Sequence, residues 1–117
     1  MSPGLLLEKI KNHPADLVFA EVLAAIDDNY IYTPTKFRNG VGDDAVVNEA
    51  GTNQGSCKVF AFARFHQLSE QETLACFAEH YRDVLADPQG TGHANIRRFM
   101  CDGWANIVFD EMPLQAR

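Results

Sequence analysis

Residues 51–68 of the chain read GTNQGSCKVFAFARFHQL. The first six residues have the polar, glycine-rich composition of a loop, whereas the stretch from Cys57 to Leu68 is densely apolar. A short apolar run is compatible with a buried helix or a buried strand. This run is longer than a typical strand, and Asn53 or Ser56 can cap a helix, so we predict a helix. Because apolar residues lie on nearly all its sides, we expect this helix at the centre of the domain.

Helical patterns flank this central segment on both sides. Residues 69–72, Ser-Glu-Gln-Glu, form a capping box, which marks the start of a helix. Elsewhere, apolar residues recur at steps of three and four, with Pro14 as a helix start and Gly103 as a C-cap. The predicted helices cover residues 3–12, 14–26, 57–68, 69–87 and 93–100.

Strand patterns occupy the middle and the end of the chain. Residues 29–33 and 45–49 have the pattern of short strands, and the Asn-Gly pair at 39–40 is a typical hairpin turn. Residues 104–109 indicate a last strand, and Pro113 is expected to end the regular structure. Strands of this kind predict a small, mostly antiparallel sheet.

Length and composition set the class of protein. A chain of 117 residues with 46% hydrophobic residues can bury one core, so we predict a single α+β domain over residues 1–117, with about five helices packed on the sheet. The net charge of −6 argues against a nucleic-acid partner, which would need a basic surface. Three cysteines without a CxxC pair indicate reduced thiols in a cytosol. No signal peptide or spanning segment is recognisable, so no membrane insertion is expected.

Four separated segments resemble one known family. They read IDDNYIYTPTKFRNG at 26–40, NEAGTNQGSCKVFAFARFHQLSEQETLACFAEHYRDVL at 48–85, GHANIRRFMCDGW at 92–104 and ANIVF at 105–109. The pattern resembles the HopJ type III effector family over roughly residues 6–110.

The resemblance implies a bacterial protein whose molecular activity is unknown. The family is named for proteins that plant pathogens inject into host cells through a type III secretion apparatus, and it transfers no catalytic residues to this chain. We expect a protein-interaction module that is either a secreted effector with a partner protein in a host cell or a housekeeping relative in the bacterial cytoplasm. Few residues precede the first predicted helix, which leaves little chain for a flexible export segment.

The loop at residues 51–58 suggests a first alternative function. Gly51, Asn53, Gly55 and Ser56 lead into the predicted central helix, and backbone N–H groups at a helix N-terminus attract anions. The spacing does not match a Walker phosphate loop, because only three residues separate the glycines. The sequence therefore leaves two interpretations open: a small-anion or phosphate site, or glycines that let a buried helix pack closely.

Cys57 suggests a second alternative, a cysteine-dependent hydrolase or transferase. A cysteine at a helix N-terminus has a lowered pKa and is a better nucleophile. Gln54 could contribute to an oxyanion hole, in an arrangement similar to that of papain-like proteases, with His93 or His80 as the base. The chain is about half the size of a papain-like domain, so a small buried thiol in a core helix is the competing interpretation.

The histidines give no metal site in the sequence alone. No His pair has the i, i+4 spacing of a helical zinc site, and no His-x-His strand occurs. The Asp pairs at 27–28 and 43–44 lack the ligand spacing of a calcium loop. We therefore expect neither a metal site nor a cofactor.

Overall fold

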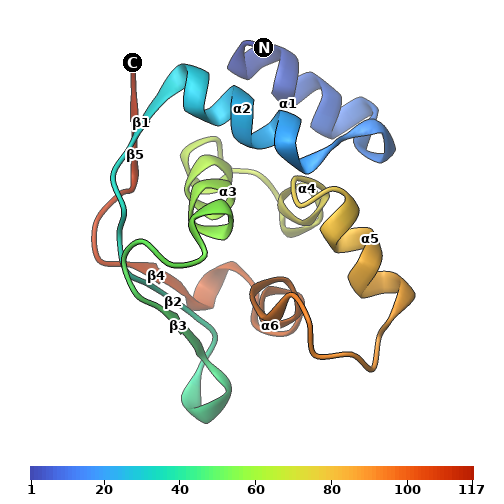
Figure 1. The fold of residues 1–117 in the computed structure, drawn as a ribbon, viewed down its shortest axis with the longest axis vertical. Helices are drawn as coiled ribbons and strands as arrows, with labels where there is room; N and C mark the ends of the chain where they lie inside the picture. The colour runs from blue at the N-terminus through green and yellow to red at the C-terminus, as the bar shows by residue number, and fades with distance from the viewer.

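The computed structural model describes all residues, 1–117, as one α+β domain. Helices surround a central helix, and short strands line one side of the molecule (Figure 1). No helix is both long enough and apolar enough to cross a membrane. The helices are α1 (Pro3–Asn12), α2 (Phe19–Asn29), α3 (Gln54–Phe65), α4 (Glu70–Ala75), α5 (Glu79–Ala86) and α6 (Ala94–Asp102), and the strands are β1 (Tyr30–Tyr32), β2 (Phe37–Asn39), β3 (Val46–Asn48), β4 (Ile107–Phe109) and β5 (Leu114–Ala116).

Helix α3 lies at the centre of the fold, as its composition predicts. Figure 1 shows it enclosed by α2, α4, α6 and the strands. Phe60 is fully buried, and its ring lies 5.1 Å from that of Phe99 and 5.3 Å from that of Phe77. Its ring also meets those of Phe37 on β2 and Trp104 after α6. Aromatic side chains from β2, from the turn after α4 and from α6 and the turn that follows it therefore converge on Phe60 of α3.

The strands form two small antiparallel sheets. Strands β3, β2 and β4 are paired in that order, with Phe37 opposite Asn48 and Phe109. Strand β1 pairs instead with β5, with Tyr30 opposite Ala116. The prediction that Pro113 ends the regular structure is wrong, because the strand that follows it gains hydrogen-bond partners from β1, which is remote in sequence. The predicted strand at 104–109 is confirmed only at Ile107–Phe109, since a 3₁₀ turn occupies Trp104–Asn106.

The helix predicted over residues 69–87 is broken in two. Its capping box is confirmed: the Ser69 hydroxyl accepts from the Glu72 amide, and the Glu72 carboxylate accepts from the Ser69 amide. The break falls at Ala78, which has a φ of 53° and is buried. An alanine rarely adopts a positive φ, so the surrounding packing holds this turn in place. The break redirects α5 toward α6.

The second predicted helix also begins later than expected. Pro14 starts a 3₁₀ turn, Pro14–Asp16, and α2 begins only at Phe19. The first N–H of α2 donates to the Glu79 carboxylate at 2.7 Å, so a side chain from α5 caps α2. Gly103 follows α6 with a φ of 69°, as a C-cap glycine does, and a Cβ there would lie 2.3 Å from a Glu70 oxygen.

Candidate functional site

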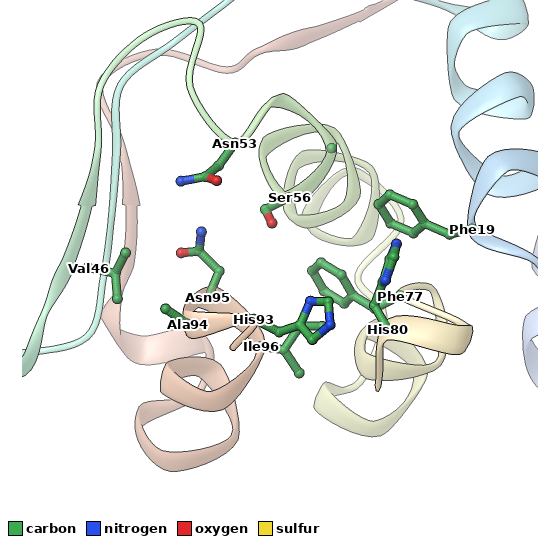
Figure 2. A pocket seen from close by; sticks show the side chains of 11 residues that line it. Phe19, Val46, Asn53, Ser56, Phe77, His80, His93, Ala94, Asn95 and Ile96 are labelled. Carbon is green, nitrogen blue, oxygen red and sulfur yellow. The ribbon is translucent and has the colours of Figure 1, made fainter. Parts of the chain in front are cut away.

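A cleft of about 380 Å³ opens between the beginnings of α3, α5 and α6. Figure 2 shows Asn53 and Ser56 on one side, His93 and Asn95 on another, and His80 beside Phe19. The lining contains no Asp, Glu, Lys or Arg, although the chain carries 16 acidic residues. Histidine is therefore the only ionisable type of side chain that lines this cleft. The lining residues are Phe19, Val46, Asn53, Gly55, Ser56, Phe77, His80, His93, Ala94, Asn95 and Ile96.

Two helix N-termini open into this cleft. Asn53 precedes α3 and His93 precedes α6, and both adopt the left-handed conformation, with φ values of 48° and 58°. Neither side chain caps its own helix. The first backbone hydrogen bond of α3 runs from the Cys57 amide to the Asn53 carbonyl, and that of α6 runs from the Arg97 amide to the His93 carbonyl. The amides of residues 54–56 and 94–96 therefore have no partner in the chain. Residues 55, 56 and 94–96 line the cleft, so it collects backbone donors from two helices.

Four asparagines hold these two N-termini together. The Asn95 carboxamide oxygen accepts from Asn39 and Asn48, each at 3.1 Å. The Asn48 oxygen accepts from Asn95 at 2.8 Å and from Asn53 at 2.7 Å. Asn39, Asn48 and Asn95 are buried, where hydrogen-bonded polar groups favour one arrangement over others. The network thus fixes the start of α6 to β2, β3 and the residue before α3.

The opposite wall of the cleft is apolar. The rings of Phe19 and Phe77 are stacked with centroids 6.1 Å apart, and the edge of Phe19 meets His80 at 4.7 Å. Gly55 lies against Phe19, where an added Cβ would be 3.0 Å from the ring. The close-packing interpretation of this glycine is therefore confirmed. The cleft combines an aromatic wall with a wall of N–H donors.

The residues predicted for an anion loop divide between the cleft and solvent. Asn53, Gly55 and Ser56 line the cleft, and no protein group bonds the Ser56 hydroxyl. Gly51 is exposed in the preceding turn and lies outside the cleft. Helix α3 begins at Gln54, three residues earlier than predicted. As a result, Gly55 and Ser56 belong to its first turn.

The structure gives the cysteine-nucleophile hypothesis no support. Cys57 is 1% exposed and does not line the cleft, whereas His93 does. The Cys57 thiol faces the Thr35 carbonyl oxygen at 3.7 Å, and burial raises its pKa. The expected lowering of that pKa is wrong, because desolvation by burial outweighs the lowering by hydrogen bonds with Tyr32 and Thr35 and by the charge of Lys58. Gln54 is exposed and also lies outside the cleft.

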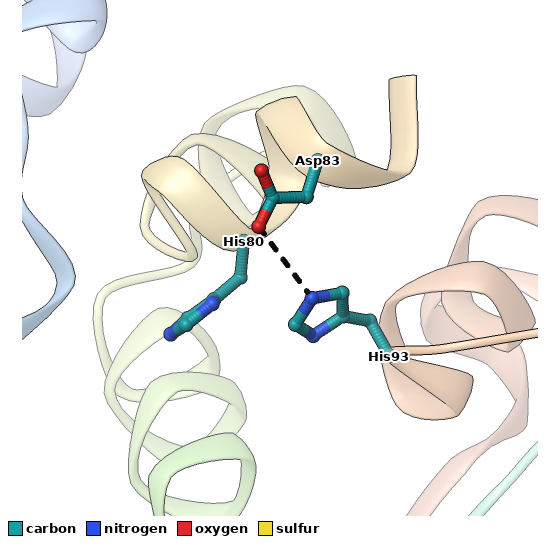
Figure 3. A group of neighbouring side chains, drawn as sticks. All are labelled: His80, Asp83 and His93. Carbon is teal, nitrogen blue, oxygen red and sulfur yellow. Dashed lines mark ion pairs between the residues drawn. The ribbon is translucent and has the colours of Figure 1, made fainter. Parts of the chain in front are cut away.

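A group of side chains that the sequence analysis did not bring together lies at the edge of the cleft. His80 and Asp83 are one turn apart on α5, and His93 precedes α6 (Figure 3). One ligand atom from each residue lies within 4.8 Å of the other two. The sequence-based expectation of no metal site rested on the spacing of histidines within one helix or one strand, which does not apply to this cluster. The break at Ala78 orients α5 so that ligands from two different elements meet.

These observations define a small α+β protein with a cleft built from helix N-termini, histidines and aromatic rings. The chain belongs to the HopJ type III effector protein family, whose family model matches residues 4–114. It is similar to a crystal structure described as that of "unknown function protein VPA0580", with 41% identity and a TM-score of 0.94. That match covers 100% of this chain and 95% of the other. No curated protein sequence matches the chain.

Proposed function

We propose that this HopJ protein binds a small anionic molecule, such as a phosphate or carboxylate compound, in the cleft between α3, α5 and α6. The observation that carries the proposal is that unpartnered N–H groups from two helices meet in a cleft with no acidic lining residue. Each helix N-terminus carries a partial positive charge of about half an elementary charge. Two such ends on one cleft favour an anion over a neutral or cationic ligand.

The shape of the cleft indicates which anions fit. A volume of about 380 Å³ lies near the lower end of the range for small-molecule sites. Phe19, Phe77 and Ile96 provide an apolar surface next to the donors. A ligand with one anionic group and a small apolar or aromatic part would use both walls.

Phenyl phosphate is a suitable probe, because it joins an aromatic ring to a phosphate. We expect saturable binding by calorimetry, with inorganic phosphate binding more weakly and benzyl alcohol not binding. The key variant is Ser56→Asp, which adds a carboxylate to the cleft at the third position of α3. A carboxylate in the first turn stabilises a helix by about 0.3–1 kcal/mol, so the variant should fold and yet lose binding.

Ser56→Asn is the matched neutral control, because it has nearly the size of the aspartate and no charge. It should keep binding within a few-fold of the wild type. If Ser56→Asp binds phenyl phosphate as well as Ser56→Asn does, the anion proposal is wrong.

Membership of the HopJ family favours a second candidate function. The family description supports delivery by type III secretion and contact with a protein in the recipient cell. The test compares export of the full chain from bacteria with and without a working type III apparatus. Equal amounts outside both strains, or none outside either, would leave the chain as a housekeeping member of the family in the bacterial cytoplasm.

A further inference from the structure

We propose that His80, Asp83 and His93 form a binding site for a divalent transition-metal ion of the zinc class. The site lies at the edge of the cleft but uses different atoms from the anion proposal, which relies on backbone amides. It goes beyond that function and does not depend on it.

The three donors come from two elements that the fold holds against each other. His80 and Asp83 share a face of α5, since residues three apart are neighbours on a helix. His93 Nε2 lies 3.8 Å from an Asp83 oxygen, and the two imidazole centroids are 5.0 Å apart. Figure 3 shows the Asp83 carboxylate paired with the His93 ring, and the His80 side chain next to them on α5.

The separations are close to those that a metal requires. Ligands about 2.0–2.2 Å from a tetrahedral ion lie roughly 3.3–3.6 Å from one another. The ligand atoms here lie within 4.8 Å of one another, so the site needs a contraction of up to about 1.5 Å. Asp83 and His93 have side chains that are 67% and 36% exposed, and both can rotate to supply it.

The donor set selects the class of ion. Two imidazoles and one carboxylate suit zinc and its neighbours in the first transition series, whereas magnesium and calcium prefer oxygen donors alone. Three protein ligands leave a fourth position for water or another ligand, as in catalytic zinc sites. Because His80 and His93 both line the cleft, that position would be accessible from it.

Two further observations point to a ligand at this place. The ring nitrogens of His80 have no hydrogen-bond partner in the chain, although the ring is half-buried between Phe19 and His93. The backbone of His93 adopts a left-handed conformation that is uncommon for a residue other than glycine. Such strain is typically retained at functional positions. An exposed ion pair between His93 and Asp83 alone would contribute little to stability and explains neither observation.

The experiment uses the untagged, chelator-treated chain in phosphate-free buffer, with zinc affinity measured by competition against a chromophoric chelator. A Cys101→Ser background removes the one exposed thiol. We expect one zinc ion per chain. His93→Gln and Asp83→Asn should each weaken binding at least tenfold, while His13→Gln, which changes an exposed histidine on the loop after α1, should leave binding unchanged.

Cobalt supplies a spectroscopic readout that a purely structural role would not change. The wild type should give the intense visible absorption of tetrahedral cobalt, and His93→Gln should lose it while its far-ultraviolet circular dichroism stays that of the wild type. The proposal is overturned if His93→Gln and His13→Gln bind zinc equally, or if the folded wild type binds no zinc. Because no phosphate is present, this result is separate from that of the phenyl phosphate titration.

Discussion

Asn95→Asp tests the asparagine network that supports the cleft. The substitution keeps the size of the side chain but replaces the Nδ2 donor by an oxygen. One carboxylate oxygen can still accept from Asn39 and Asn48, as Asn95 Oδ1 does at 3.1 Å. The other oxygen would lie near Asn48 Oδ1, which now accepts from Asn95 Nδ2 at 2.8 Å. Two acceptors would then face each other at a position that is only 6% exposed.

The size of the effect follows from these contacts. The variant loses one hydrogen bond worth about 1 kcal/mol and buries a charge beside an acceptor, which costs about 2–3 kcal/mol more. The favourable interaction of the new negative charge with the N-terminus of α6 offsets about 0.3–1 kcal/mol of this cost, because residue 95 is the second residue of that helix. We expect a net loss of about 2–4 kcal/mol in the free energy of unfolding at neutral pH.

The loss should depend on pH in a defined direction. A net cost of 2–4 kcal/mol corresponds to a pKa raised from about 3.9 to roughly 5.5–7, at 1.36 kcal/mol per unit. Below pH 3.9 the acid is protonated in both states, and its O–H can donate to Asn48, so the variant approaches the wild type. Stability is lost as the pH rises through the folded pKa, and the full cost appears above it.

Urea unfolding at pH 4 and pH 8, for variant and wild type, measures this difference. With an m-value of about 1–3 kcal/mol per M, a 3 kcal/mol loss lowers the midpoint by about 1–3 M at pH 8. Asn95→Ala is the control, and it should cost about 1–3 kcal/mol at both pH values because alanine has no group that titrates. In this variant the Asn39 amide can still donate to the backbone carbonyl of residue 95, and the Asn48 oxygen can still accept from Asn53. If Asn95→Asp lowers the free energy of unfolding equally at both pH values, or more at pH 4, the assignment of Asn95 Nδ2 as a donor to Asn48 Oδ1 is refuted.

Three further predictions concern the core, a cap and the thiols. Phe60→Ala should lower the free energy of unfolding by about 3–5 kcal/mol, measured by urea denaturation, since it empties the centre of the aromatic core; a loss below 1 kcal/mol would contradict that role. Glu79→Gln should cost about 0.5–1 kcal/mol of unfolding free energy at pH 7 and less in acid, because the hydrogen bond from the first N–H of α2 lowers the Glu79 pKa. The stability from this carboxylate is present above its unfolded pKa and is lost as the pH falls through its folded pKa. An equal cost at pH 7 and pH 3 would disprove this role. A thiol reagent at pH 8 should label Cys101 rapidly and Cys57 only on unfolding, and fast labelling of both in the native protein would show the Cys57 assignment to be wrong.

The parts of the fold that sequence predicts well are those with local causes. The capping box at Ser69 and the C-cap glycine at Gly103 act within one turn of their helices, and both are confirmed. The central position of α3 follows from an apolar composition on nearly all its sides, and six of its residues are buried. In these cases a window of about ten residues contains the whole physical reason.

The parts that sequence misses depend on partners far along the chain. Nothing in the sequence near Ala78 indicates a positive φ, and the burial of this residue in the core becomes visible only in the fold. Strand β5 exists because β1 offers it hydrogen bonds, and Cys57 is inert because the core covers it. His80 and His93 meet only after the helix breaks at Ala78. Spacing within one helix therefore could not reveal the cluster.

The pairing of β1 with β5 has a consequence for the order of folding events. Tyr30 and Ala116 must meet although most of the chain lies between them, so closing this loop carries an entropic cost. Helices α1 to α6 involve local contacts and can form earlier, whereas this two-stranded sheet, like the remote pairing of β2 with β4, should form late. Until then β1 is an unpaired edge, open to the same segment of another chain. The slowest step in folding should therefore also be the step that is most exposed to aggregation.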